Sequence, residues 1–264
     1  MALAFGAPER FPSPFPSTRF GAHRTLMPRA RGTPDDPLLS VVMPVFNEGA
    51  TIDEIIRRVL AVPLRTQLIV VDDCSTDGTR DTLTRLQGEL GFTLLLQPKN
   101  RGKGAALRAG FEAVRGDLVV IQDADLEYDP QDWALMYDLI ALRKVADVVY
   151  GSRFHGRAHR SLYFHHYLAN RLISLLFNAL YNQTLSDIET CYKMMTVGVA
   201  RSLRLSADDF GAEVEISANI ARQRKLRIYE LGITYYGRSY DEGKKINWKD
   251  GVKALWYLLK FRFA

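Results

Sequence analysis

The chain has 264 residues, of which 47% are hydrophobic and 25% charged, and it carries a formal net charge of +5 at pH 7. These values suit a globular protein of one large or two small domains, with anionic partners such as nucleotides or an anionic membrane face. No run of about 18 uncharged apolar residues occurs, which argues against a transmembrane helix. Two distant cysteines, Cys74 and Cys191, argue against a disulfide framework or a zinc site and fit a reducing cytoplasm.

The first 37 residues are rich in proline, arginine and small side chains and show no apolar periodicity. We predict that residues 1–37 are disordered and that one folded domain spans residues 38–264.

From residue 38 onward, apolar runs typical of strands alternate with helical patterns. Strands are predicted at 38–45, 67–71, 92–97, 118–122, 228–230 and 233–236, and helices at 51–60, from the turn 75–78 to about 87, and at 104–114. Thr51 and Glu54 have the spacing of a capping box that would open the first helix. This alternation predicts an α/β fold whose central sheet is mostly parallel, is covered by helices on both faces and binds ligands at the carboxyl ends of its strands.

The apolar run 118–121 leads into three acids on alternate positions, Asp123, Asp125 and Glu127. Carboxylates two residues apart in an extended segment project the same way and repel one another unless a cation lies between them. Mg²⁺ or Mn²⁺ prefers such oxygen ligands, so this pattern predicts a metal site that bridges a bound diphosphate. The alternative is a solvated acidic loop before a helix, because Asp129-Pro130 is typical of a helix start.

Two further strand ends carry polar groups. Asp73 could accept hydrogen bonds from a base or a ribose, or it could cap the following turn. The segment 100–104, with Arg101, Lys103 and two glycines, is in outline an anion cradle before a helix. The spacings of a P-loop and of a dinucleotide-binding Gly-rich turn are absent, which argues against a P-loop ATPase and a nicotinamide-binding protein.

Four motifs in order along the chain carry a resemblance to a known family: 43–48 (MPVFNE), 71–79 (VDDCSTDGT), 122–127 (QDADLE) and 151–154 (GSRF). Together they resemble the family 2 glycosyltransferases, and within these the dolichyl-phosphate mannose synthase branch. The resemblance runs from about residue 38 to the C-terminus. It implies a GT-A fold, a nucleotide-diphosphate sugar donor, Mg²⁺ or Mn²⁺, and a polyprenyl-phosphate acceptor.

Matching the motif positions implies roles for individual residues. The donor nucleotide would be bound by Pro44, Val45, Glu48, Asp73, Lys103, Asp123, Ala124 and Lys245. The metal would be bound by Asp123, Asp125 and Glu127. Arg153 would hold the acceptor phosphate, with Arg160, Arg171 and Ser174 as further candidates, and Asp187 and Glu213 would contact the sugar. Asp125, Arg153 and Arg238 would be the catalytic residues.

The chemistry of the acceptor is consistent with these residues. A phosphomonoester has a second pKa of about 6, so it is mostly dianionic at neutral pH and attacks an anomeric carbon without a protein base. In-line displacement would invert the anomeric configuration. Arginine suits the acceptor phosphate, and a metal offsets charge on the departing diphosphate.

The C-terminal part of the sequence suggests contact with a membrane. A helix at about 161–181 is either a core helix or an interfacial helix that guides a lipid acceptor to Arg153. A glycine-hinged loop with Arg238, Lys244 and Lys245 is predicted to close over the diphosphate, or else is a solvated basic loop. The helix at about 247–263 is amphipathic and basic, which favours peripheral attachment to the cytoplasmic face of a membrane or to a membrane-anchored partner subunit.

The sequence therefore predicts an inverting, metal-dependent glycosyltransferase that moves mannose or glucose, from GDP-mannose or UDP-glucose, to a polyprenyl phosphate. One alternative is a related enzyme of cell-envelope glycan synthesis with a hydroxyl acceptor, which would need Asp187 or Glu213 as its base. The other is a non-catalytic subunit that binds nucleotide sugars. No nucleic-acid partner is expected, because no recognised module accompanies the basic charge.

Overall fold

The computed structural model describes residues 36–156, 160, 163–209, 211–239, 241–242 and 248–263. Within these residues, seven strands form one sheet in the order β3-β2-β1-β4-β6-β5-β7. Their bounds are β1 Leu39–Val45, β2 Thr66–Asp72, β3 Thr93–Leu96, β4 Leu118–Ile121, β5 Val148–Ser152, β6 Lys193–Thr196 and β7 Ile228–Gly232. The strand β6 runs antiparallel to β4 and β5, and the other pairs are parallel, so the predicted mostly parallel sheet is confirmed.

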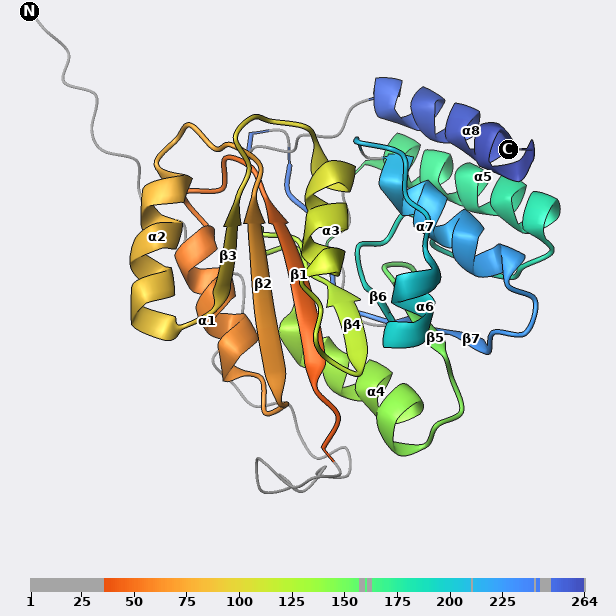
Figure 1. Cartoon of the computed structure of the whole chain (residues 1–264). Coiled ribbons are helices and arrows are strands. Elements are labelled where there is room, and N and C mark those ends of the chain that lie inside the picture. Colours follow the sequence, from red (N-terminus) through yellow and green to blue (C-terminus); the bar gives the residue numbers. More distant parts are fainter. Residues whose placement is uncertain are drawn as a thin grey trace, which may run out of the picture.

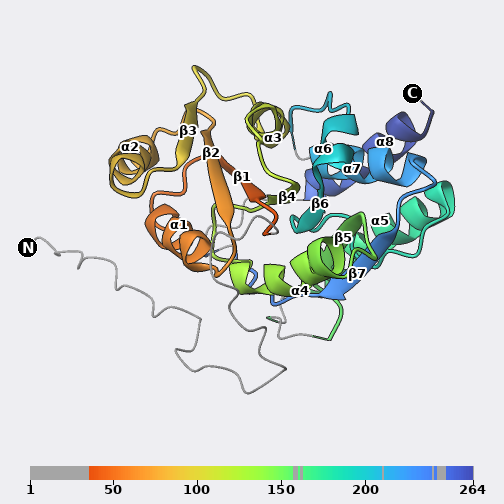
Figure 2. The same cartoon turned by 60° about the horizontal axis from the view of Figure 1, so that its bottom comes forward.

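Helices cover both faces of this sheet, as the sequence predicts. The α-helices are α1 Ile52–Ala61, α2 Thr79–Leu90, α3 Lys103–Glu112, α4 Trp133–Tyr137, α5 Phe164–Tyr181, α6 Val197–Ser202, α7 Gly211–Arg222 and α8 Trp248–Phe263. A 3₁₀ turn precedes α4 and a π turn follows it, at Pro130–Asp132 and Asp138–Leu142. Figure 2 shows α1 and α4 on one side of the sheet and α3, α6 and α7 on the other. The helices α5 and α8 lie side by side at one end of the molecule (Figure 1).

The centre of the sheet is fully buried because helices cover both of its faces. Every residue of β1 and β4 is buried, which explains why both strands are continuous apolar runs in the sequence. The helix α3 packs closely on β1 at Gly110, where a Cβ atom would lie 2.3 Å from Cγ1 of Val42. This rigid layer brings the carboxyl ends of β1, β2 and β4 to one edge.

Two local predictions are wrong. Thr51 forms no side-chain cap on α1; its hydroxyl instead lies within hydrogen-bonding distance of two acceptors, Oε2 of Glu48 at 3.2 Å and the carbonyl of Ala124 at 3.0 Å. The predicted strand 233–236 is a loop joined to Tyr128 by one isolated bridge at Tyr235. In both cases contacts with the loop after β4 replace the local pattern. Residues 1–35 lie outside the described residues, so the predicted disorder stays a prediction.

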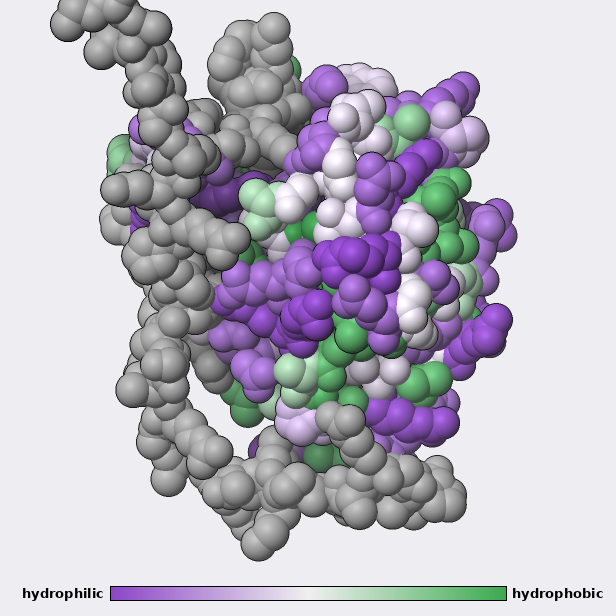
Figure 3. Space-filling model, turned by 90° about the vertical axis from the view of Figure 1, so that its left-hand side faces the viewer, coloured by the Kyte–Doolittle hydropathy of each residue, from purple (hydrophilic) through white to green (hydrophobic). Residues whose placement is uncertain are grey.

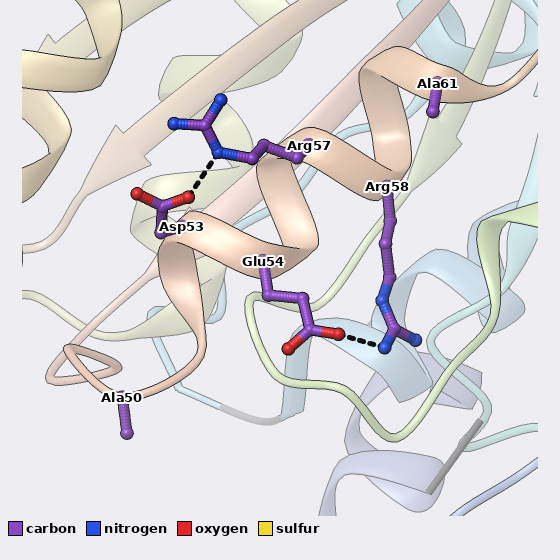
Figure 4. Close-up of a pocket in the computed structure, with 6 residues that line it drawn as sticks. All are labelled: Ala50, Asp53, Glu54, Arg57, Arg58 and Ala61. Atoms are coloured by element: carbon purple, nitrogen blue, oxygen red, sulfur yellow. Dashed lines mark hydrogen bonds and ion pairs between the residues drawn. The ribbon is translucent and has the colours of Figure 1, made fainter. Parts of the chain in front are cut away.

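The side of the domain formed by α1 and α2 is largely hydrophilic (Figure 3). Exposed ion pairs cover it, with Arg57 2.5 Å from Asp53 and Arg85 2.7 Å from Glu89. A surface pocket on α1 is lined by Ala50, Asp53, Glu54, Arg57, Arg58 and Ala61 (Figure 4). Its charges are paired along the helix, so we interpret this surface as a solvated face and not as a ligand site.

Candidate active site

A cavity of about 1220 Å³ lies at the carboxyl ends of the central strands. Most of the residues predicted from the sequence line it. They are Pro44, Val45, Glu48, Asp73, Lys103, Asp123, Ala124, Asp125, Glu127, Arg153, Arg160, Glu213 and Arg238. Parallel strands explain this convergence, because their carboxyl ends meet at the same edge of the sheet.

Asp73 fastens the loop before α3 to the end of β2. Its carboxylate accepts hydrogen bonds from the backbone N–H groups of Arg101 at 2.9 Å and Gly102 at 2.6 Å. Burial raises the pKa of Asp73, and these two hydrogen bonds oppose the rise. Gly102 has a φ of +94°, and a Cβ atom there would lie 2.4 Å from the carbonyl oxygen of Asp208. The loop therefore needs glycine at this position, and the contact of Asp73 with a nucleoside stays a prediction.

Three carboxylates meet at Arg238. Its guanidinium lies 2.8 Å from Asp125, 3.2 Å from Glu127 and 3.3 Å from Glu48. Burial raises the pKa of the Asp125 carboxyl well above its ordinary value, and the nearby charges of Glu127 and Asp123 raise it further. Arg238 therefore offsets mutual repulsion among these acids.

The three predicted metal ligands are not gathered around one point. Asp123 faces Lys103, with its Oδ1 2.7 Å from the Lys103 ammonium, whereas Asp125 and Glu127 face Arg238. Among the residues that the structure describes, no group of three or more histidine, cysteine or acidic side chains is placed to hold a metal ion. Oxygen ligands that repel one another nevertheless fit a hard divalent cation chemically.

Arg153, at the end of β5, is held in position by Asp187. The guanidinium nitrogens Nε and Nη2 each lie 2.7 Å from a carboxylate oxygen of Asp187, and the Arg153 backbone N–H donates to the same carboxylate at 3.1 Å. The guanidinium also stacks 5.4 Å from the ring centre of Tyr235. Asp187 is fully buried beneath Arg153 and does not line the cavity. Asp187 thus holds the Arg153 side chain in this structure, and its contact with the sugar stays a prediction.

Glu213 lies between two lysines at the floor of the cavity. Its carboxylate is 2.9 Å from the ammonium of Lys103 and 2.5 Å from that of Lys193, which is fully buried. Because Lys103 also binds Asp123, a chain of alternating charges runs from α7 to the end of β4. This arrangement fixes Glu213 and leaves its contact with a sugar as a prediction.

The remaining candidates for the acceptor phosphate differ in position. Arg160 lines the cavity, and its guanidinium lies 2.5 Å from Glu242. Arg171 and Ser174 do not line the cavity. Arg171 donates to the carbonyl of Ser186 at 3.4 Å, and the buried Ser174 hydroxyl accepts the backbone N–H of residue 188 at 3.3 Å. Both side chains support the neighbouring loop. Lys244 and Lys245 lie outside the described residues.

Sequence reasoning did not identify three residues that organise this site. Lys193 begins the buried strand β6 and binds Glu213. A lysine next to an apolar run was the only signal in the sequence that could have pointed to this residue. Glu230, on the edge strand β7, accepts hydrogen bonds from the loop that carries Asp187. Tyr235 donates a hydrogen bond to Glu127 at 2.8 Å, and no sequence pattern indicates this pairing.

The helices α5 and α8 form an apolar mouth beside this cavity. Their N-terminal halves line it through Tyr163, Phe164, Tyr167, Val252 and Leu255. Their last turns are joined by a hydrogen bond of 3.0 Å from Arg262 to the carbonyl of Leu180. The large apolar side chains exposed along both helices are Phe164, Tyr167, Leu168, Leu172, Leu175, Leu176, Val252, Trp256, Leu259 and Phe263. None of the described helices has the length and apolar composition needed to cross a bilayer.

The family model for glycosyl transferase family 2 matches residues 40–209, which include the strand ends that build this cavity. The chain therefore belongs to glycosyl transferase family 2. Its fold is similar to that of glucosyl-3-phosphoglycerate synthase from Mycobacterium tuberculosis, solved with Mn²⁺, uridine diphosphate and phosphoglyceric acid. The TM-score is 0.65 at 22% identity, over 86% of this chain and 78% of that one, and this likeness confirms the GT-A type of fold.

Two curated relatives are named for glycan biosynthesis or for a dodecaprenyl phosphate. The low-salt glycan biosynthesis hexosyltransferase Agl6 of Haloferax volcanii is 29% identical over 84% of this chain and 53% of its own length. The dodecaprenyl-phosphate galacturonate synthase of Rhizobium johnstonii is 36% identical over 49% of this chain and 41% of its own length. The chain thus spans about half the length of these relatives or less.

Proposed function

We propose that this protein transfers a sugar from a nucleotide-diphosphate donor to a polyprenyl phosphate with inversion at the anomeric carbon. The observation that carries the proposal is that Arg153, held by the buried Asp187, lines the same cavity as the acids that follow β4. An arginine fixed in this way presents a phosphate-binding group in one orientation. The name of the dodecaprenyl-phosphate synthase supports the acceptor class.

The donor would lie along the ends of β1, β2 and β4. Glu48 and Asp73, which line the cavity, would contact the nucleoside, and Asp123 and Asp125 would hold Mg²⁺ or Mn²⁺ with the diphosphate. When bound, the metal would offset the negative charge that builds on the departing diphosphate. Arg238 would add a second positive charge at the same position, because it already binds Asp125.

The acceptor needs no base on the protein, since a phosphomonoester is mostly ionised at pH 7. Arg153 would orient the acceptor oxygen toward the anomeric carbon, and Asp187 would keep Arg153 from turning away. Glu213, held by Lys103 and Lys193, would accept hydrogen bonds from hydroxyls of the sugar. Mannose or glucose, as GDP-mannose or UDP-glucose, are the donors we would assay first.

The mouth between α5 and α8 would admit the prenyl chain from a membrane surface. Apolar side chains are exposed on both helices, with Leu175 63% and Trp256 56% exposed, and the basic residues Lys253 and Lys260 lie on α8. Exposed aromatic and aliphatic groups next to lysines favour the interface of an anionic leaflet. The hydrophilic α1–α2 side is unlike this surface, so the domain would bind by one end (Figure 3).

The test is a transfer assay with a panel of nucleotide sugars, Mn²⁺, and either a short prenyl phosphate or the matching prenyl alcohol. We expect a product with the phosphate and none with the alcohol, and a severe loss of transfer in Arg153→Ala. Equal use of the alcohol, with Arg153→Ala unaffected, would show that the acceptor is a hydroxyl compound. A protein that binds nucleotide sugars but transfers to neither would be a binding subunit.

A further inference from the structure

The loop between α5 and β6 is fixed on both sides of Glu189. On one side, Glu230 accepts the backbone N–H of Asp187 at 3.1 Å, and the Ser174 hydroxyl accepts that of Ile188 at 3.3 Å. On the other side, the carbonyl of residue 190 accepts a hydrogen bond from the buried Lys193. The position of Glu189 is therefore set by its neighbours along the chain.

The side chain of Glu189 lines the cavity that Arg153 also lines. The other acids of the cavity wall are bound by cations or by backbone N–H groups: Glu48, Asp73, Asp123, Asp125, Glu127, Asp209 and Glu213. For Glu189, no hydrogen bond or ion pair is found among the described residues. This carboxyl is thus available to a ligand.

The charged side chains around Glu189 form ion pairs, in each of which a positive charge offsets a negative one. Arg153 is paired with Asp187, and Lys193 with Glu213. Burial raises the pKa of Glu189 to about 7; Arg153 and Lys193 oppose the rise, whereas Asp187 and Glu213 add to it. From α5, Arg171 contacts the same loop at the Ser186 carbonyl, and His165 and His166 line the cavity.

An acceptor phosphate on Arg153 would bring two negative charges into the cavity that contains this carboxylate. Like charges that meet in a partly buried site do not all stay ionised. We propose that Glu189 accepts a proton when the acceptor binds and then, as the neutral acid, donates a hydrogen bond to the phosphate held by Arg153. This inference rests on the acceptor class proposed above and adds a second acceptor-binding residue to it.

The protons balance in either ionisation state of the acceptor. With a monoanionic acceptor, an O–H bond of the phosphate breaks and an O–H bond forms on Glu189; with a dianionic acceptor, the proton comes from solvent. During transfer, a phosphate oxygen bonds to the anomeric carbon while the bond from that carbon to the diphosphate oxygen breaks. The proton stays on Glu189 in this step and returns to solvent when the phosphodiester, with its single charge, leaves.

Calorimetry of geranyl phosphate binding, without donor, tests this proton uptake. At pH 7.5 the acceptor is almost entirely dianionic, since its second pKa is about 6, so protons taken up belong to the protein. Titrations in two buffers of different ionisation enthalpy should show an uptake of roughly 0.7 proton per acceptor for the wild type and none for Glu189→Gln. Wild-type affinity should fall about tenfold between pH 7 and 8.5, and that of Glu189→Gln should stay level.

Two further variants complete the experiment. Glu189→Asp should still take up a proton, and Glu112→Gln, which removes an exposed carboxylate at the end of α3, should behave as the wild type. Unchanged uptake in Glu189→Gln would overturn the inference and assign the proton to another group of the cavity, with the acceptor class intact. If Glu189→Gln bound equally weakly at every pH, the carboxylate would serve another contact and the inference would also fail. A wild type that binds no prenyl phosphate would overturn the acceptor class as well.

Discussion

Replacing Asp187 with asparagine separates the positioning of Arg153 from its charge. The bidentate ion pair between Asp187 and Arg153 is buried, because the Asp187 side chain is inaccessible to solvent and the Arg153 side chain is 11% exposed. Removing the charge of one partner leaves the guanidinium uncompensated, which we expect to cost about 3 kcal/mol of folding stability. For a domain of this size that corresponds to a fall in Tm of roughly 6–12 °C.

The effect on function should fall on the acceptor. Without its carboxylate partner, Arg153 can turn, and a misplacement of about 1 Å costs about 10²-fold in rate. We expect kcat/KM for a short prenyl phosphate to fall by about that factor in Asp187→Asn. Donor affinity, measured separately by calorimetry with nucleotide sugar and Mn²⁺, should stay near the wild-type value, because the donor residues lie on other strands.

A second bidentate ion pair between an arginine and an aspartate provides the matched control. Arg227 binds Asp147 through Nε at 3.0 Å, Nη2 at 2.8 Å and its backbone N–H at 2.8 Å, which is the same arrangement at an exposed position. Because the Arg227 side chain is 53% exposed, Asp147→Asn should cost about 1 kcal/mol or less and leave transfer unchanged. Equal Tm losses in the two variants, or normal acceptor use by Asp187→Asn, would refute the positioning role.

Four further outcomes are expected. Asp125→Asn should lower turnover by several orders of magnitude while its Tm stays at or above the wild-type value, since a repelled buried charge is removed; near-normal turnover would argue against a metal ligand here. Arg238→Ala should raise the KM for the donor more than the KM for the acceptor, and the reverse order would contradict its place beside the diphosphate. Trp256→Asp should weaken sedimentation with anionic vesicles, whereas Leu96→Asp, at a site 48% exposed on β3, should not; equal effects would rule out a specific membrane face. Because burial raises the pKa of Glu189 from 4.5 to about 7, the contribution of this residue to folding stability is complete below pH 4.5 and is lost as the pH rises through 7. Glu189→Gln should therefore melt at a higher temperature than the wild type at pH 8 and at the same temperature at pH 4.5.

The sequence alone predicted the sheet and the acids at its edge. The run of β4 from Leu118 to Ile121 contains no polar residue, which favours a strand buried on both faces and places the acids that follow at the strand's carboxyl end. The motif order predicted the family, which the match over residues 40–209 confirmed. These features are local, because strand periodicity and turn chemistry act over a few neighbouring residues.

The tertiary structure decided which charges meet. Asp187 and Glu189 are two residues apart in one loop, yet Asp187 is buried beneath Arg153 and Glu189 lines the cavity. Arg238 reaches Asp125 across 113 residues of sequence, and Glu213 meets Lys193 from a different layer of the fold. Such pairings depend on the direction of each side chain after the helices pack on the sheet, and no pattern within a single segment specifies that direction.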